Sequence, residues 1–202
     1  MVYSTKLIDS VLRKDIKIVR LSDSYDIKPF DCGVPDLNEF LFNDAKTYLK
    51  YLSSTTFLFE NDIKTIAYYS LLNDLLNIDP NIDKEFEQEI IDIIADKDYS
   101  FLLEMKGISM FPAAKIGRFA VDKSFQRYGY GTEILQLIVM SFLSNNKTGC
   151  QFITVDALNN MDTLRFYEKN GFSFVTLADY NRPSRQMYKN LIALKQVEYL
   201  QE

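Results

Sequence analysis

Histidine is absent from all 202 residues of the chain. This absence excludes Ser-His-Asp and Cys-His catalysis and argues against a conventional zinc enzyme. Any general base must therefore be a carboxylate, a tyrosine, water or the backbone. Cysteine is scarce too: Cys32 and Cys150 lie far apart, so we expect neither a disulfide framework nor a metal site. With no histidine to activate it, Cys32 is expected to be a packed cysteine rather than a nucleophile.

Long apolar runs are also missing. No stretch approaches the ~18–20 residues of a membrane span. The N-terminus carries charges every few residues and no small-residue cleavage pattern, so we expect no signal peptide and a cytoplasmic protein. A hydrophobic content of 47%, with 15 Phe and 13 Tyr, is typical of a packed globular enzyme. The length suits one domain spanning residues 1–202.

The net charge of −5 is unevenly distributed. Residues 74–98 hold nine acidic and two basic residues, a balance of −7. The apolar residues of this segment, which include Phe86, Ile90 and Ile94, favour an amphipathic helix. We therefore expect an acidic helical insertion around residues 74–98. Two interpretations stay open, a solvated charged face and a surface that attracts cationic substrates.

The hydrophobic pattern along the chain alternates between strands and helices. Asp36 and Glu39 have the spacing of a helix-start box, and Asn61-Asp62 indicates a hairpin turn. The pattern predicts strands at residues 16–21, 55–60, 65–70, 101–105, 116–121, 151–156, 172–177 and 185–189, and helices at 7–12, 36–52, 134–144, 160–170 and 191–202. This order predicts an α/β chain with a mixed sheet.

One glycine loop has a functional pattern. Residues 126–131, QRYGYG, follow the apolar stretch 116–121 and precede the helix-like stretch 134–140. The first N–H groups of a helix lack internal partners, its dipole adds positive charge there, and glycines let the backbone approach closely. The loop therefore predicts a pyrophosphate site. It has no Lys-Ser/Thr pair and no third glycine, which excludes a nucleoside-triphosphate loop and the dinucleotide fingerprint. The alternative is an ordinary glycine turn.

A second motif follows. After the β-like run 152–157, residues 159–172 read as a helix that Asn159 or Asn160 caps and Gly171 ends. With both motifs in this order, the chain resembles the GNAT superfamily of acetyl-CoA-dependent N-acetyltransferases. Gln126, Gly129 and Gly131 match the family's Gln/Arg-x-x-Gly-x-Gly/Ala motif, and the later Asn…Tyr…Gly-Phe pattern ends at Gly171-Phe172.

The resemblance implies a fold, a cofactor and a set of site residues. The implied fold is a mixed, mostly antiparallel central sheet flanked by helices, in a single GNAT-type domain over residues 1–202, with acetyl-CoA as cofactor. The implied coenzyme A-binding residues are Phe119, Ala120, Val121, Gln126, Arg127, Tyr128, Gly129, Tyr130, Gly131, Thr132 and Asn160. Tyr167 is the implied general acid, and no metal is expected. The alternative role of Tyr167 is that of a half-buried aromatic side chain that only packs.

Part of the chain is similar to one branch of that superfamily. Residues 30–33, FDCG, with 37–41, LNEFL, and 117–121, GRFAV, are similar to the acetyltransferase toxins of toxin–antitoxin pairs. Those toxins acetylate the amino group of aminoacyl-tRNA. The resemblance implies charged tRNA as acceptor and an antitoxin as partner. A homodimer is left open.

Acyl transfer from a thioester needs a stabilised oxyanion, a neutral amine and a protonated leaving thiolate. Backbone N–H groups at a bulge in strand 116–122 would serve the first need, and the Tyr167 phenol, with a reference pKa near 10, would serve the last. The family's glutamate base corresponds to Lys115, which leaves Glu60 and Glu104 as substitutes. An α-amine, with a reference pKa near 8, needs less help from a base than a lysine side chain.

The acidic net charge of the chain argues against an RNA-borne acceptor. A pI of about 4.9 provides no surplus of basic residues for RNA phosphates. The leading hypothesis is an N-acetyltransferase that moves an acetyl group from acetyl-CoA to a primary amine. The alternatives are a toxin-type enzyme acting on aminoacyl-tRNA and a non-catalytic acyl-CoA-binding module.

Overall fold

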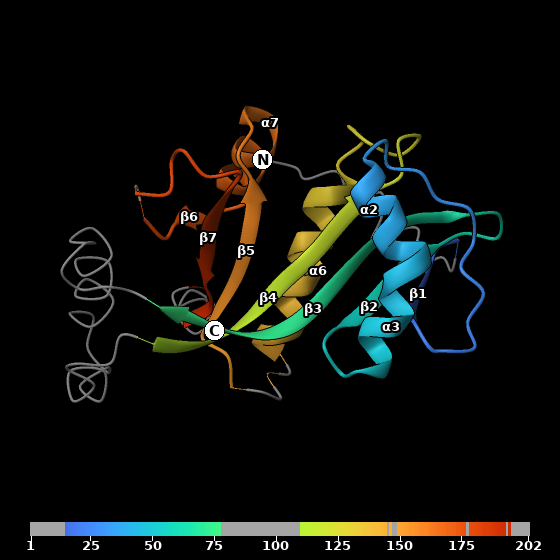
Figure 1. Cartoon of the computed structure of the whole chain (residues 1–202), viewed down its shortest axis with the longest axis horizontal. Coiled ribbons are helices and arrows are strands. Elements are labelled where there is room, and N and C mark those ends of the chain that lie inside the picture. The colour runs from blue at the N-terminus through green and yellow to red at the C-terminus, as the bar shows by residue number, and fades with distance from the viewer. Residues whose placement is uncertain are drawn as a thin grey trace, which may run out of the picture. The chain divides into compact units, whose positions relative to one another are not determined.

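The computed structural model describes residues 15–77, 110–144, 146, 149–176, 178–192 and 194. Within these residues, strands form one mixed sheet in the order β1-β2-β3-β4-β5-β7-β6 (Figure 1). The strands are β1 (Lys17–Arg20), β2 (Thr55–Glu60), β3 (Thr65–Asn77), β4 (Met110–Val121), β5 (Phe152–Leu158), β6 (Ser173–Phe174) and β7 (Ser184–Asn190). The helices are α2 (Pro35–Glu39), η1 (Phe40–Asp44), α3 (Ala45–Lys50), α6 (Tyr130–Ser144) and α7 (Met161–Lys169).

The α/β class and the mostly antiparallel sheet predicted from the sequence are confirmed. The pairs β1–β2, β2–β3, β5–β7 and β6–β7 are all antiparallel. The chain divides into two compact units. The first comprises residues 1–72 and 116–140, and the second comprises 73–115 and 141–202. The single domain over residues 1–202 stays a prediction.

The predicted hairpin of the first unit is present. Phe57 pairs with Tyr69 and Leu58 with Tyr68 across β2 and β3. The Asn61 side chain closes the turn by accepting the backbone N–H groups of Ile63 and Lys64, at 2.9 and 2.8 Å. An asparagine side chain that accepts backbone N–H groups two and three residues ahead stabilises a tight turn.

The predicted helix at residues 36–52 is broken into three pieces, because the five residues of η1 form a π-helical turn. The helix-start box is wrong as well. The helix begins at Pro35, whose fixed φ suits a first helical position, and its N-cap Val34 makes no side-chain capping bond. Asp36 instead lies in the first turn, where its charge favours the helix dipole.

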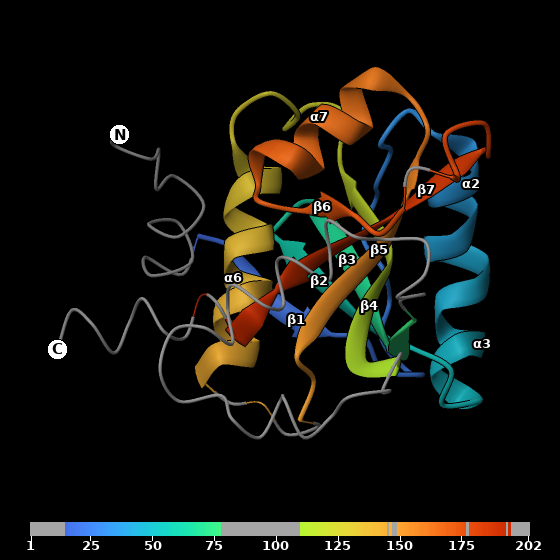
Figure 2. The ribbon, with the colours of Figure 1, turned by 90° about the vertical axis from the view of Figure 1, so that its left-hand side faces the viewer.

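The strands of the first unit lie between α6 on one side and α2–α3 on the other (Figures 1 and 2). On the α2–α3 side, Phe40, Leu41 and Ala45 join a buried cluster with Leu58 and Tyr68. On the other side, α6 buries an apolar face with helical spacing, made of Ile134, Leu135, Ile138 and Val139. Burial on both faces gives the strand end that precedes the glycine loop a packed support.

In the second unit, β5 and β7 pair along their whole length, from Phe152↔Asn190 to Leu158↔Ser184. Helix α7 lies beside the short strand β6 (Figure 2). Asn160 caps α7 by accepting the Thr163 N–H at 2.9 Å, and Gly171 stops it with φ at 76°. Both the cap and the stop were predicted from local sequence and are confirmed.

The acidic segment 74–98 begins as strand rather than helix. β3 continues through Asn77, and Asp74 accepts the Thr154 hydroxyl at 2.6 Å, so its carboxylate serves the sheet. Residues 78–98 lie outside the described residues, as do the predicted helix at 7–12, the strand at 101–105 and most of the tail 191–202. Of the helices described, none combines the length and apolar character that crossing a membrane requires.

Candidate functional site

The strand–loop–helix order predicted around residues 126–131 is present in the first unit. β4 ends at Val121 and α6 begins at Tyr130. In the loop between them, Arg127 and Gly129 adopt left-handed φ angles of 65° and 92°. Gly131 lies in the first turn of α6, where the backbone N–H groups have no intrahelical acceptor. The loop therefore presents the N–H groups and partial positive charge that a pyrophosphate needs.

The backbone conformation at position 129 requires a glycine, whereas the space around it does not. A Cβ placed on it would meet only the Glu133 carboxylate oxygen, at 3.9 Å, but its φ of 92° is one that L side chains rarely adopt. The residue is exposed and the space beside it is open. These features fit the close approach of a phosphate to the backbone.

Gln126, the first residue of the loop motif, uses its side chain to shape the loop. Its amide nitrogen donates to the Val121 and Cys32 carbonyls, both at 2.9 Å. One bond ties the loop to the end of β4, and the other ties it to the segment at residues 30–33. Because the side chain is used in this way, we propose that Gln126 would contact the cofactor through its backbone.

Asp122 anchors the same loop. Its buried carboxylate accepts the Asp31 N–H at 3.1 Å, the Ser124 N–H at 2.9 Å, the Ser124 hydroxyl at 2.5 Å and the Lys64 ammonium at 2.7 Å. Burial alone would raise the pKa of Asp122, but the donors from Lys64, Ser124 and Asp31 outweigh it and hold the pKa below its ordinary value. Asp122 is therefore an ionised, fully bonded anchor.

The segment 30–33 is a folded turn with its own bonds. Asp31 accepts the Gly33 N–H and the Asn38 side-chain N–H, at 2.8 and 2.9 Å. Asn38 in turn accepts the Cys32 N–H at 3.0 Å and its thiol at 3.2 Å. Burial raises the pKa of the Cys32 thiol, which fits the packed cysteine predicted from the sequence. Both Cys32 and Cys150 are buried, and neither is in a disulfide.

The implied coenzyme A-binding residues fall mainly in the first unit. Phe119, Ala120 and Val121 end β4, and the run from Gln126 to Thr132 forms the loop and the start of α6. The bulge predicted in strand 116–122 stays a prediction. Asn160 belongs to the second unit, where its side chain serves as the α7 cap.

Tyr167 lies on α7 in the second unit. It is 6% exposed and stands edge-on to Phe166 and Phe172, with ring centroids 5.2 and 5.3 Å away. Burial raises its pKa well above the ordinary value, so the phenol stays protonated at neutral pH. Its hydroxyl has no hydrogen-bond partner among the residues described here. The acid form and the uncommitted O–H are compatible with a proton donor, although the raised pKa makes Tyr167 a weaker acid, and its catalytic role stays a prediction.

Lys115, at the position expected for a catalytic glutamate, faces a carboxylate that sequence reasoning missed. Its ammonium lies 2.5 Å from Asp156 on β5. Glu60, a candidate base, is buried and already accepts the Tyr25 hydroxyl at 2.5 Å and the Thr65 hydroxyl at 2.9 Å. Glu60 is thus committed to the hairpin. Glu104 lies outside the described residues.

Residues 86–174 match the family model described as Acetyltransferase (GNAT) domain. No curated protein is similar enough in sequence to count as a relative. The match confirms the resemblance predicted from the two motifs.

Three solved structures share the fold. A tyrosine-to-phenylalanine mutant of KacT is 22% identical, with a TM-score of 0.68 over 91% of this chain and 99% of that chain. AtaT complexed with acetyl-methionyl-tRNAfMet is 21% identical, with a TM-score of 0.68 over 93% and 100%. AtaTR bound with AcCoA is 21% identical, with a TM-score of 0.67 over 94% and 99%. These similarities establish the same fold along most of each chain.

Proposed function

We propose that this GNAT-type acetyltransferase transfers the acetyl group of acetyl-CoA to the α-amino group of an aminoacyl-tRNA. One observation carries the proposal: the toxin-like segment 30–33 is bonded directly to the glycine-loop region, through Asp31 to Asp122 and Cys32 to Gln126. The toxin-like motif is therefore part of the architecture that shapes the loop. The structures of AtaT with acetyl-methionyl-tRNAfMet and of AtaTR with AcCoA support this choice of acceptor and cofactor.

Bound acetyl-CoA supplies the acetyl thioester. The backbone of residues 126–132 binds its pyrophosphate, and the backbone of residues 119–121 positions its pantetheine arm. The neutral α-amine would attack the thioester carbonyl to form the C–N bond, and Tyr167 would give its phenolic proton to the sulfur as the C–S bond breaks. The proton that the attacking nitrogen loses would restore the phenol. Proton donation by a positioned side chain contributes ~10²–10⁴-fold to a rate.

An α-amino acceptor suits the residues around Lys115. Among the described residues, the carboxylate nearest to Lys115 is that of Asp156, which is ion-paired with it at 2.5 Å and is therefore not a free base. An α-amine has a reference pKa near 8, so a substantial fraction is neutral without a base, whereas a lysine amine near 10.4 depends on one. The uncommitted Tyr167 phenol argues against a non-catalytic acyl-CoA-binding module.

The cellular context follows from the acceptor. Charged tRNA places the enzyme in the cytoplasm. A related structure contains AtaT with the C-terminus of its antitoxin AtaR, and we extend that association to a protein antitoxin for this chain. Such a partner would keep the acetylation of charged tRNA under control.

Radiolabelled acetyl-CoA tests the activity directly. We expect label on the aminoacyl group of charged tRNA and none on the same tRNA after deacylation. Binding that neutralises several phosphates weakens steeply with added salt, whereas one small amine gives a shallow slope. No label on charged tRNA, together with robust acetylation of a polyamine or peptide, would overturn the proposal and leave the primary-amine acetyltransferase.

A further inference from the structure

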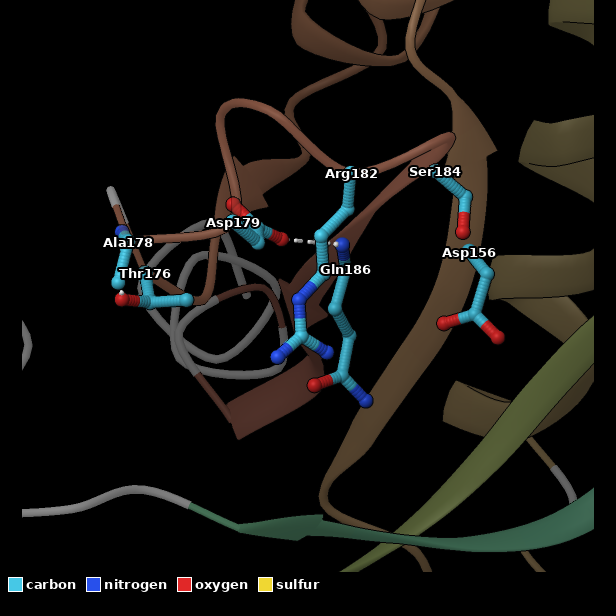
Figure 3. A pocket seen from close by; sticks show the side chains of 7 residues that line it. All are labelled: Asp156, Thr176, Ala178, Asp179, Arg182, Ser184 and Gln186. Carbon is cyan, nitrogen blue, oxygen red and sulfur yellow. Dashed lines mark hydrogen bonds between the residues drawn. The ribbon is translucent and has the colours of Figure 1, made fainter.

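A polar pocket of about 400 Å³ lies in the second unit, between β5 and the segment that leads into β7 (Figure 3). Its lining residues are Asp156, Thr176, Ala178, Asp179, Arg182, Ser184 and Gln186. Figure 3 shows the polar ends of Arg182 and Gln186 side by side, with Asp156 on β5 across from them. The volume is within the range of small-molecule sites.

The frame of this pocket is held by hydrogen bonds of Asp179, one of its lining residues. Asp179 is buried and accepts the Arg185 guanidinium at 2.9 Å and the Gln186 N–H at 3.0 Å. Arg185 also stacks 3.8 Å from the centre of the Phe174 ring. These bonds fix the backbone of the segment that leads into β7, so the side chains of this segment that line the pocket are held in a preformed arrangement.

The same segment is tied to the helix that carries Tyr167. The Asn159 side chain donates to the Tyr180 and Arg182 carbonyls, at 2.7 and 2.8 Å. Its neighbour Asn160 caps α7. Two adjacent asparagines therefore fix the pocket wall and the start of the Tyr167 helix together.

The groups that face the pocket are available for a ligand. Asp156 is 47% exposed, so its carboxylate is accessible to a ligand beside its 2.5 Å ion pair with Lys115. The Arg182 guanidinium, the Ser184 hydroxyl and the Gln186 side-chain amide make no hydrogen bond or ion pair with any described residue. A guanidinium and a carboxylate thus line one pocket without pairing with each other, which suits a ligand that carries both an N–H donor such as an amine and an anionic group.

We infer that this pocket holds the aminoacylated 3′ end of the acceptor, with Asp156 accepting an N–H of the α-amino group and Arg182 binding the phosphate of the terminal nucleotide. The inference rests on the proposed function and adds its specificity determinants. Ser184 and Gln186 supply neutral hydrogen-bonding groups for the ribose and base. A polyamine has no anionic group for Arg182, so the pocket selects against it.

The test uses two small acceptors, a 3′-aminoacylamido-adenosine with a 5′-phosphate and the same compound without it. For Arg182→Gln we expect the KM of the phosphorylated acceptor to rise roughly 10–100-fold, the range of one charge-assisted hydrogen bond, while the KM of the unphosphorylated acceptor stays nearly constant. Asp156→Asn should raise the KM of both acceptors. Coenzyme A affinity should not change in either variant. Arg165→Gln, which removes an exposed charge from α7, is the matched control.

Equal KM values for the two acceptors in the wild-type enzyme, or an Arg182→Gln variant that behaves like Arg165→Gln, would overturn the inference. Calorimetry separates this failure from that of the proposed function. If neither compound is acetylated, but the phosphorylated one binds and loses binding in Arg182→Gln, the pocket assignment stands and the aminoacyl-tRNA activity falls. If neither compound is acetylated or bound, both fall.

Discussion

The backbone N–H of Asp31 donates to the Asp122 carboxylate at 3.1 Å, across 91 positions of sequence. Lys123 strengthens the same junction, because its N–H donates to the Asp31 carbonyl at 2.8 Å and its ammonium lies 2.6 Å from the Asp31 carboxylate. The segment that resembles acetyltransferase toxins and the segment that leads into the glycine loop are therefore held as one assembly. A change at this junction should disturb both.

Replacing Asp122 with asparagine should lower the free energy of unfolding by about 3 kcal/mol, since it removes one partner of a mostly buried ion pair. The folded-state pKa of Asp122 lies below its ordinary value, so the carboxylate stabilises the protein above that value and loses its effect as the pH falls through the folded pKa. The difference between wild type and variant should therefore shrink below about pH 4. Urea unfolding over pH 3–7 measures it, with the exposed Asp23→Asn as control. A constant difference over this range would contradict the role of the charge.

Local chemistry made several elements predictable from the sequence. The loop before α6 follows from its glycines, and α7 follows from Asn160 and Gly171, because each signal acts within a few residues. The Asp31–Asp122 and Lys115–Asp156 contacts could not be predicted, since they depend on strands that meet only in the folded chain.

Two errors have a physical cause. The acidic composition of residues 74–98 predicts a helix, yet residues 74–77 continue strand β3, where the Asp74 carboxylate accepts the Thr154 hydroxyl, and an acid paired in this way is compatible with a strand. The π-helical turn at residues 40–44 interrupts a helix whose interior carries no breaker, since neither proline nor glycine follows Pro35 at its first position. Phe40 and Leu41 of that stretch join a buried cluster with Leu58 and Tyr68, and periodicity alone does not report such tertiary contacts.

Gly129→Val should abolish most coenzyme A binding, because a β-branched residue resists a φ of 92° and the loop would have to change shape. Calorimetry with coenzyme A measures the loss. Gly149→Val is the matched control, since Gly149 also has a positive φ, 69°, and open space around it but belongs to the other unit. Unchanged affinity in Gly129→Val would remove the pyrophosphate from this loop.

Gly117→Ala tests the close contact between β3 and β4 in the first unit. A Cβ at this position would lie 2.6 Å from the Leu72 Cδ2 atom. Since that atom is the far end of a flexible side chain, we expect destabilisation near the lower end of overpacking, about 1 kcal/mol. The Gly117→Ala/Leu72→Ala pair should be more stable than the sum of the two single changes predicts. If the changes in unfolding free energy of the two single variants simply add up in the double variant, the Cβ added at position 117 does not clash with the Leu72 side chain.

Tyr25→Phe should destabilise the protein by about 1–3 kcal/mol at pH 7, because it removes a donor from the buried Glu60 carboxylate. The hydrogen bond to Glu60, then burial and the Glu60 charge, raise the pKa of Tyr25 to about 12. A tyrosine with a raised pKa stabilises the fold below pH 10 and loses this effect as the pH rises towards 12. The gap between variant and wild type should close over that interval in thermal melts, whereas the exposed Tyr51→Phe should show no gap at any pH.

Tyr167→Phe should keep coenzyme A binding and the free energy of unfolding, since the Tyr167 hydroxyl has no hydrogen-bond partner among the described residues. Its kcat should fall by ~10²–10⁴-fold, the usual contribution of a general acid. Because burial raises the pKa of Tyr167, the acid form persists on the alkaline side, and wild-type kcat should show no loss of this donor between pH 7 and 10.

The matched control for this change is Tyr69→Phe, which removes another buried phenol, one whose pKa burial raises to about 12 and which lies in the first unit. That variant should retain wild-type turnover, because the Tyr69 ring packs against Phe57 and Phe59 of the first unit. Steady-state kinetics with saturating acetyl-CoA compares the two. A Tyr167→Phe enzyme within a few-fold of wild type would return Tyr167 to a packing role beside Phe166 and Phe172, and another group would have to protonate the leaving thiolate.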